Sequence, residues 1–141
     1  IEHEDLLKEI RLPVLNSWID ALNSADLKAL MHLYTNKSVV LSSYSDRPRI
    51  NLKQIEDFYS AVFNKMEDLH VDILDIKKNR INGVTTDYGH YEVKWKSQGY
   101  TEKSRLRFSM VVNDGKILSQ HSSIDPEDDI SDEETTNNMM K

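Results

Sequence analysis

His121 and Asp87 are the two side chains of this sequence whose types could carry acid–base chemistry together. An imidazole and a carboxyl group are a common pair for moving a proton onto and off a bound molecule, provided that both reach one cavity. Polar groups also crowd around His121, in the run Gln120-His121-Ser122-Ser123 near the end of an otherwise apolar segment. This cluster indicates that the end of the segment lines a cavity or an interface.

Four predicted strands would have to position these side chains. Alternating hydrophobicity predicts strands over residues 69–81, 84–97, 100–112 and 116–125. Short turns join them, and two of these turns, Asn-Gly and Asp-Gly, are strong signals for two-residue hairpins. Three hairpins in succession predict an antiparallel meander.

The turns also predict which residues lie opposite each other. A two-residue turn at 98–99 places Gly89 opposite Phe108, and one at 114–115 places Phe108 opposite His121. Directly opposed residues point to the same face of a sheet. One face should therefore carry Asp87, Tyr91, Val93, Trp95, Leu106, Phe108, Met110, Ile117, Ser119, His121 and Ser123.

The N-terminal part of the chain predicts helices. Apolar residues recur at helical spacing over residues 4–23, and Pro13 should kink this helix or mark a restart because it lacks a backbone donor. Ser24 is expected to cap a second helix, with Asp26 in the first turn, where the helix dipole favours an anion. Tyr34 belongs to the apolar stripe of this second helix.

A short strand and a third helix complete the predicted elements. The strand is Val39-Val40-Leu41, and Asn51 followed by Gln54 resembles a capping box for a helix that runs to about Asn64. Helices followed by a meander predict an α+β fold, in which a cone-shaped, curved antiparallel sheet packs on three N-terminal helices.

A mainly apolar face with a few polar groups is typical of a small-molecule site. The candidate catalytic residues are His121 and Asp87. The register places Arg105 on the opposite face, although a β-bulge near residue 104 would turn it inward. Proton transfer by the pair, lining of a ligand pocket and a purely structural role all stay open. The candidate ligand-binding residues are Tyr91, Arg105, Ser119, Ser123, Trp18 and Tyr59.

Composition limits the classes of function. The net charge of −6 argues against a nucleic-acid or membrane-binding surface, since phosphates require concentrated Lys and Arg. The chain has no cysteine, and its five histidines lack metal-ligand spacing, so neither a metal nor a cofactor is expected. There is also no apolar run long enough to span a membrane.

The length of 141 residues predicts one domain over residues 1–126 and an acidic C-terminal tail over residues 127–141. The chain starts at Ile1 rather than Met, which is equally compatible with a removed signal peptide and with a shortened start. We expect a cytoplasmic location and leave secretion open.

Several short motifs, taken in order, resemble the nuclear transport factor 2-like superfamily. They are Trp18-Ile-Asp-Ala-Leu-Asn-Ser-Ala-Asp26, Leu33-Tyr34, Val39-Val40-Leu41, Gly89-His-Tyr91, Arg105-Leu-Arg-Phe108 and His121-Ser-Ser-Ile-Asp-Pro126. Within this superfamily the chain is most similar to the group of the calcium/calmodulin-dependent kinase II association domain and its small bacterial relatives, near the SnoaL-like proteins. The resemblance covers about residues 5–126.

This resemblance implies a cone-shaped fold with a deep pocket and assembly through the outer face of the sheet. Arg105 matches a pocket arginine of the kinase association domains. Relatives commonly carry a second histidine beside the one that matches His121; Gln120 stands there in this chain, which argues against a two-histidine mechanism. The superfamily includes isomerases, cyclases, hydrolases and non-catalytic assembly modules, so the fold alone does not give an activity.

Three functions therefore compete. The first is a pocket protein that self-associates as a dimer or larger and binds a small ligand, anions included. The second is a small isomerase, cyclase or dehydratase that uses Asp87 and His121. The third is a pure oligomerisation module, for which the expected apolar residues of the outer face are Val71, Ile73, Val111 and Leu118.

Overall fold

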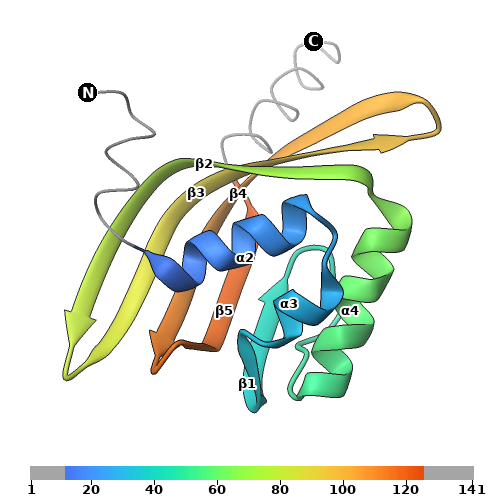
Figure 1. The fold of residues 1–141 in the computed structure, drawn as a ribbon. Coiled ribbons are helices and arrows are strands. Elements are labelled where there is room, and N and C mark those ends of the chain that lie inside the picture. Colours follow the sequence, from blue (N-terminus) through green and yellow to red (C-terminus); the bar gives the residue numbers. More distant parts are fainter. Residues whose placement is uncertain (1–11, 126–141) are drawn as a thin grey trace, which may run out of the picture.

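A computed structural model of the protein describes residues 12–125. Its elements in chain order are α2 (Pro13–Asn23), α3 (Leu27–Met31), β1 (Tyr34–Ser42), α4 (Leu52–Lys65), β2 (Glu67–Ile81), β3 (Val84–Ser97), β4 (Tyr100–Asn113) and β5 (Lys116–Ile124). The strands form one curved sheet, and α2 lies across its concave face (Figure 1). The predicted α+β class is confirmed. The acidic tail and the predicted start of the first helix lie outside the described residues.

The sheet has the strand order β1-β5-β4-β3-β2. Strands β2 to β5 form the predicted antiparallel meander, whereas β1 pairs with β5 in parallel, so the sheet is mixed rather than wholly antiparallel. The parallel pairing is possible because α4 and strands β2 to β4 separate β1 from β5 in the chain. This connection brings a strand from the N-terminal half beside the last strand.

Helices α2 and α3 begin at residues that reduce the number of unpaired backbone amides in the first turn. Pro13 occupies the first turn of α2, so a helix begins at this proline, and the predicted helical residues before it lie outside the described part of the chain. The assignment of Ser24 as the N-cap of the second helix was wrong, since Ser24 is the C-cap of α2. The cap of α3 is Asp26, whose carboxylate accepts a hydrogen bond from the Ala29 amide at 3.0 Å. Tyr34, expected on the second helix, instead begins β1.

The capping residues predicted for α4 are confirmed. The Asn51 side chain accepts a hydrogen bond from the Gln54 amide at 2.9 Å. In return the Gln54 side chain accepts one from the Ile50 amide at 3.2 Å, so two otherwise unpaired amides at the start of the helix are satisfied.

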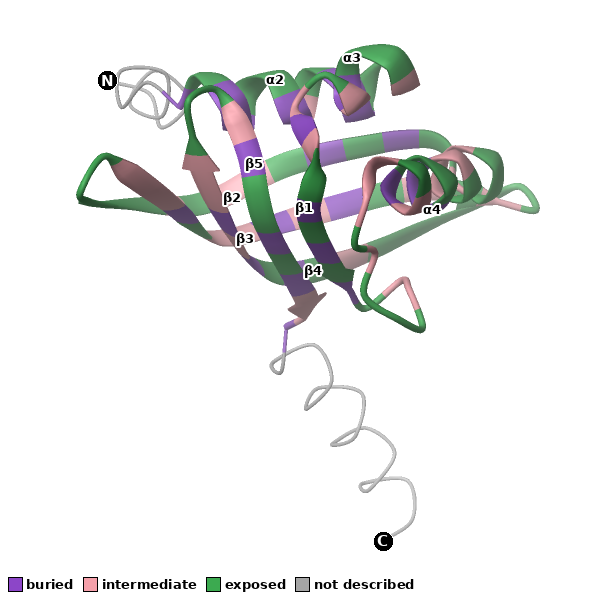
Figure 2. Cartoon of the chain, turned by 90° about the horizontal axis from the view of Figure 1, so that it is seen from below, coloured by how far each residue is buried: buried purple, intermediate pink, exposed green. Residues whose placement is uncertain are grey.

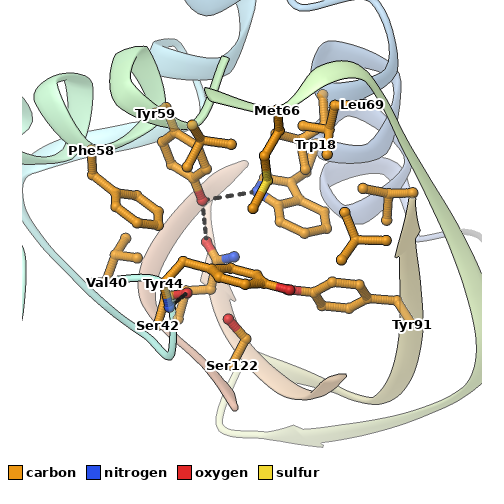
Figure 3. A pocket seen from close by; sticks show the side chains of 15 residues that line it. Trp18, Val40, Ser42, Tyr44, Phe58, Tyr59, Met66, Leu69, Tyr91 and Ser122 are labelled. Atoms are coloured by element: carbon orange, nitrogen blue, oxygen red, sulfur yellow. Dashed lines mark hydrogen bonds between the residues drawn. The ribbon is translucent and has the colours of Figure 1, made fainter. Parts of the chain in front are cut away.

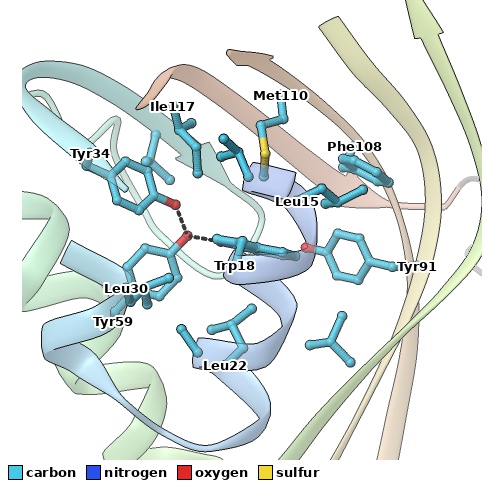
Figure 4. Close-up of a cluster of buried hydrophobic side chains, with 14 of the residues drawn as sticks. Leu15, Trp18, Leu22, Leu30, Tyr34, Tyr59, Tyr91, Phe108, Met110 and Ile117 are labelled. Atoms are coloured by element: carbon cyan, nitrogen blue, oxygen red, sulfur yellow. Dashed lines mark hydrogen bonds between the residues drawn. The ribbon is translucent and has the colours of Figure 1, made fainter. Parts of the chain in front are cut away.

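The core fills the space between the helices and the concave face of the sheet (Figure 4). Helix α2 contributes Leu15 and Trp18, and the sheet contributes Leu106, Met110 and Ile117, all with almost no exposed surface. Burial alternates along the strands, so inward and outward side chains can be told apart (Figure 2). Among the described residues, no helix is long and apolar enough to cross a membrane.

A β-bulge in β2 changes the predicted facing of that strand. Its register with β3 shifts by one residue between Ile73 and Asp75. As a result, Val71 lies opposite Val93 and Ile73 lies opposite Tyr91, both toward the core. Placing Val71 and Ile73 on the outer face was therefore wrong, because the shift by one residue exchanges the two faces.

Gly89 is required beside this bulge. A side-chain carbon at this position would stand 2.2 Å from the Asp75 carbonyl oxygen and 2.9 Å from the Asp75 carboxylate. The bulged backbone of β2 thus presses directly against the Cα of Gly89. Glycine is the residue that allows such an approach.

We predict that Gly89→Ala lowers the free energy of unfolding by about 3 kcal/mol, at the upper end of overpacking costs. Gly83→Ala is the matched control, because Gly83 has a positive φ of 81° but no atom within 4 Å of an added carbon. That change should cost only about 1–2 kcal/mol from backbone strain. Urea unfolding of both variants measures the difference. Equal losses would contradict the close approach of β2.

Candidate functional site

The register between β4 and β5 determines which polar side chains of β5 point toward the concave face of the sheet and the hollow predicted there. It follows the prediction at Asn113–Lys116 and at Val112–Ile117, but the next pair joins Val111 to Ser119. Leu118 is thus an extra residue in β5, a β-bulge. Beyond it, every side chain of β5 lies on the face opposite to the predicted one.

The prediction that His121, Ser119 and Ser123 face the hollow was therefore wrong. His121 and Ser119 are exposed, and Ser123 accepts a hydrogen bond from the exposed Arg107 guanidinium at 3.2 Å. Gln120 and Ser122 face inward instead, with only 3% and 5% of their surface exposed. These two residues were missed as site candidates. The adjacent apolar residues Ile117 and Leu118 are the local sign of the irregularity.

Asp87 is buried on the inner face, as predicted, but away from Gln120. It borders a separate hollow near Pro13, at the start of α2, and near Lys78. Its Oδ1 atom has no hydrogen-bond partner within residues 12–125. Burial raises the pKa of Asp87, and the charge of Lys78 opposes this rise. Since His121 lies on the outer face, the two candidate catalytic groups do not share a cavity.

Arg105 lies on the outer face, where the predicted register places it. The pairing of β3 with β4 is continuous through Glu92–Arg105 and Val93–Ser104, so the bulge considered near residue 104 is absent. Arg105 borders a surface hollow with Asp125 and His90. The inward arginine implied by the resemblance is therefore not found at this position.

An apolar hollow lies between α2, α4 and the concave face of the sheet (Figure 3). It encloses about 440 Å³ not filled by atoms, its open mouth included. Of the predicted ligand-binding residues, Trp18, Tyr59 and Tyr91 lie on its wall. The full wall consists of Trp18, Leu22, Val40, Ser42, Tyr44, Phe58, Tyr59, Val62, Met66, Leu69, Val71, Tyr91, Val93, Gln120 and Ser122.

A chain of hydrogen bonds runs along one side of this hollow (Figures 3 and 4). The Trp18 indole donates to the Tyr59 hydroxyl at 3.3 Å, and the hydroxyls of Tyr59 and Tyr34 are 2.8 Å apart. Tyr34 donates to Oε1 of Gln120, which the Tyr59 hydroxyl also approaches at 3.4 Å. All four side chains are buried, so the network joins α2, α4, β1 and β5 inside the fold.

The hollow is electrically neutral. None of its described wall residues is Asp, Glu, Lys, Arg or His. Burial raises the pKa of Tyr34, Tyr59 and Tyr91 above the ordinary value, which keeps the phenols protonated at neutral pH. The wall therefore offers hydroxyl and amide groups that bind by hydrogen bonding and no ionised group that takes up or releases a proton. Within residues 12–125 no cluster of His, Asp and Glu could hold a metal ion.

Comparison with known proteins identifies the family. A family model of the SnoaL-like domain matches residues 15–120. No curated protein sequence matches the chain significantly.

Solved structures share the fold at low sequence identity. A Xanthomonas campestris protein, named provisionally as a calcium/calmodulin-dependent protein kinase II association domain, is 24% identical with a TM-score of 0.72, over 81% of this chain and 84% of that one. A provisionally named SnoaL-like polyketide cyclase from Shewanella denitrificans OS-217 is 15% identical with a TM-score of 0.61, over 87% and 95% of the two chains. An LEH-like epoxide hydrolase of M. tuberculosis is 11% identical with a TM-score of 0.64, over 82% of each chain.

The buried Asp87 gives a test based on pH. Below the ordinary pKa of 3.8 its carboxyl group is protonated in both the folded and the unfolded chain. As the pH rises, the unfolded chain releases this proton first, so the wild type loses stability until the raised pKa of the folded state is passed. We therefore predict that the melting temperature of Asp87→Asn rises relative to wild type between pH 3 and pH 7.

Asp20→Asn, at an exposed position of α2 that does not border this hollow, is the matched control for this series. Its difference from wild type should change less over the same range. A difference for Asp87→Asn that shrinks toward neutral pH would show that the folded protein favours the charged carboxylate.

Proposed function

The chain belongs to the SnoaL-like domain family, and we propose that its neutral hollow binds a small, uncharged and largely apolar ligand. The observation that carries this proposal is the wall of the hollow. Aromatic and aliphatic side chains form most of it, and a few polar groups converge at Gln120 and Ser122. Concave apolar sites with few polar groups are the usual form of small-molecule sites.

The absence of charge on the described wall favours a neutral ligand over an anionic one. An anion entering the hollow would lose its hydration and meet no cation there. Desolvation without a compensating charge is costly, so anions should be excluded. Arg105, the residue that would have attracted an anion, lies on the outer face of the sheet.

The size of the hollow favours a compact ligand. Its volume is about 440 Å³ even with the open mouth included. The rings of Trp18 and Tyr91 meet edge to face with their centres 5.6 Å apart and narrow the space between α2 and the sheet. A single small ring suits this shape better than a fused ring system.

The positions of Asp87 and His121 argue against catalysis by this pair and in favour of simple ligand binding. An acid–base pair must reach one bound molecule, and these two groups lie on different faces of the sheet. Solved relatives include proteins named as a cyclase and as an epoxide hydrolase, but their identities of 15% and 11% support the fold alone.

A ligand series tests the proposal. Methylenecyclohexane is a neutral ring, and cyclohexanecarboxylate is a ring of similar size with a negative charge. We predict that the neutral compound shifts the indole N–H signal of Trp18 in NMR spectra at millimolar concentration and that the carboxylate binds at least tenfold more weakly. The chain has only two tryptophans, so Trp95→Phe assigns the Trp18 signal.

Val62→Phe should abolish the binding of methylenecyclohexane, because Val62 lies on the wall of the hollow and a larger side chain fills it. Val84→Phe is the matched control at a half-buried position outside that wall. Equal binding of the carboxylate, or binding that survives Val62→Phe, would contradict the proposed site.

We also propose that the chain self-associates through the outer face of β1 and β5. Val39, Leu41 and Leu118 are apolar and exposed there, with Leu41 exposing 41% of its surface. Adjacent exposed apolar groups on a sheet favour association, because pairing removes them from water. One solved relative carries the name of an association domain.

Leu41→Lys should shift the sedimentation coefficient at micromolar concentration toward that of a 16.4 kDa monomer, because a charge would be buried at the contact. Ile81→Lys is the matched control, since Ile81 is exposed at the end of β2, far along the sheet from Leu41. A wild-type protein that sediments only as a monomer would overturn this proposal.

A further inference from the structure

We infer that the hollow selects ligands with a hydrogen-bond acceptor, a carbonyl oxygen above all, because Gln120 turns its amide oxygen to the protein and its NH2 group to the hollow. The inference rests on the proposed ligand-binding function and names the chemical class of the ligand. It follows from the direction of the hydrogen bonds around Gln120.

That direction is fixed by Trp18. An indole N–H group donates and cannot accept, so the Tyr59 oxygen is the acceptor of the bond from Trp18. The Tyr59 proton then goes to the Tyr34 oxygen, 2.8 Å away, or to Oε1 of Gln120, 3.4 Å away. The Tyr34 proton in turn goes to Oε1 of Gln120. Each of the three protons has an acceptor in this arrangement.

With the opposite orientation of the Gln120 amide, one of these three protons has no acceptor. Its NH2 group would donate to Tyr34, and Tyr34 would donate to Tyr59, which already accepts from Trp18. The Tyr59 proton would then have no acceptor, since an NH2 group cannot accept. A buried hydroxyl left unpaired is unfavourable, so the amide oxygen faces the tyrosines.

The NH2 group of Gln120 remains for a ligand. Within residues 12–125, the tyrosine hydroxyls that bond to this side chain both reach Oε1, and Gln120 lies on the wall of the hollow. The neighbouring hydroxyls of Ser122 and Tyr91 can donate or accept and adapt to either kind of ligand. The amide nitrogen only donates. A ligand with an acceptor satisfies it, and a hydrocarbon of the same shape leaves it unpaired.

Two isosteric ligands test this inference on the wild-type protein. Cyclohexanone and methylenecyclohexane have the same ring and differ in a terminal oxygen or CH2 group. We expect the ketone to bind about tenfold more tightly, the effect of one good hydrogen bond. The NMR signals of the Gln120 side-chain NH2 group should shift with the ketone and stay in place with the hydrocarbon.

Gln120→Met should remove the tenfold preference while both ligands still bind, because the side chain keeps its length and loses its donor. Gln98→Met makes the same exchange at an exposed turn and should keep the preference. The hydrocarbon reports on the integrity of the hollow in each variant. If Gln120→Met does not fold, the wild-type affinity ratio and the NH2 shifts decide the question alone.

The outcomes separate the two proposals. Equal binding of both ligands to the wild type overturns the selection for an acceptor and leaves the ligand site intact. Failure of both ligands to bind overturns the proposed function and this inference with it. A preference for the ketone that persists in Gln120→Met would assign the donor to another group and also overturn the role of Gln120.

Discussion

Two of the irregularities in the register of the sheet, both β-bulges, are the constraint on which the interior of this protein depends. Each inserts one residue into a strand, Leu74 into β2 and Leu118 into β5, and each exchanges the faces of the residues that follow or precede it. The bulge in β5 brings Gln120 and Ser122 inside and leaves His121 outside. The bulge in β2 brings Val71 to the wall of the hollow. Two single-residue insertions therefore decide the chemistry of the site.

The hydrogen-bond chain from Trp18 to Gln120 explains how an apolar interior tolerates polar groups. Burying a hydroxyl or an amide is unfavourable unless it is paired, and each group in this chain pairs with the next. The partners come from four elements, and Tyr34 and Gln120 are 86 residues apart in the sequence. Such a network can form only when the helices and the sheet are already in place, so it favours one arrangement of the fold over looser ones.

The sequence predicted the parts of the fold that local chemistry controls. The hairpin at Gln98-Gly99 set the pairing of β3 with β4 residue by residue, and Asn51 with Gln54 marked the start of α4. The prediction from sequence failed where contacts between residues far apart in the chain determine the structure. The adjacent apolar residues Ile117 and Leu118 are a local sign of the bulge in β5, but they do not show which residue is inserted. The close contact that requires Gly89 involves Asp75, on another strand, and is not visible in the local pattern.

In the candidate site, too, some positions follow from local sequence patterns and others depend on the bulge in β5. Trp18, Tyr59 and Tyr91 could be placed near a cavity from periodicity and register, because all three belong to elements other than β5. The choice between His121 and Gln120 could not be made, since it depends on a single inserted residue. That choice changes the kind of chemistry expected. With His121 inside, the hollow would hold a group that exchanges protons near neutral pH. With Gln120 inside, recognition depends on shape and on the direction of neutral hydrogen bonds, and the carboxyl group of Asp87 borders a separate hollow. A neutral interior of this kind distinguishes ligands by which atoms accept hydrogen bonds, and it does so without a change of protonation.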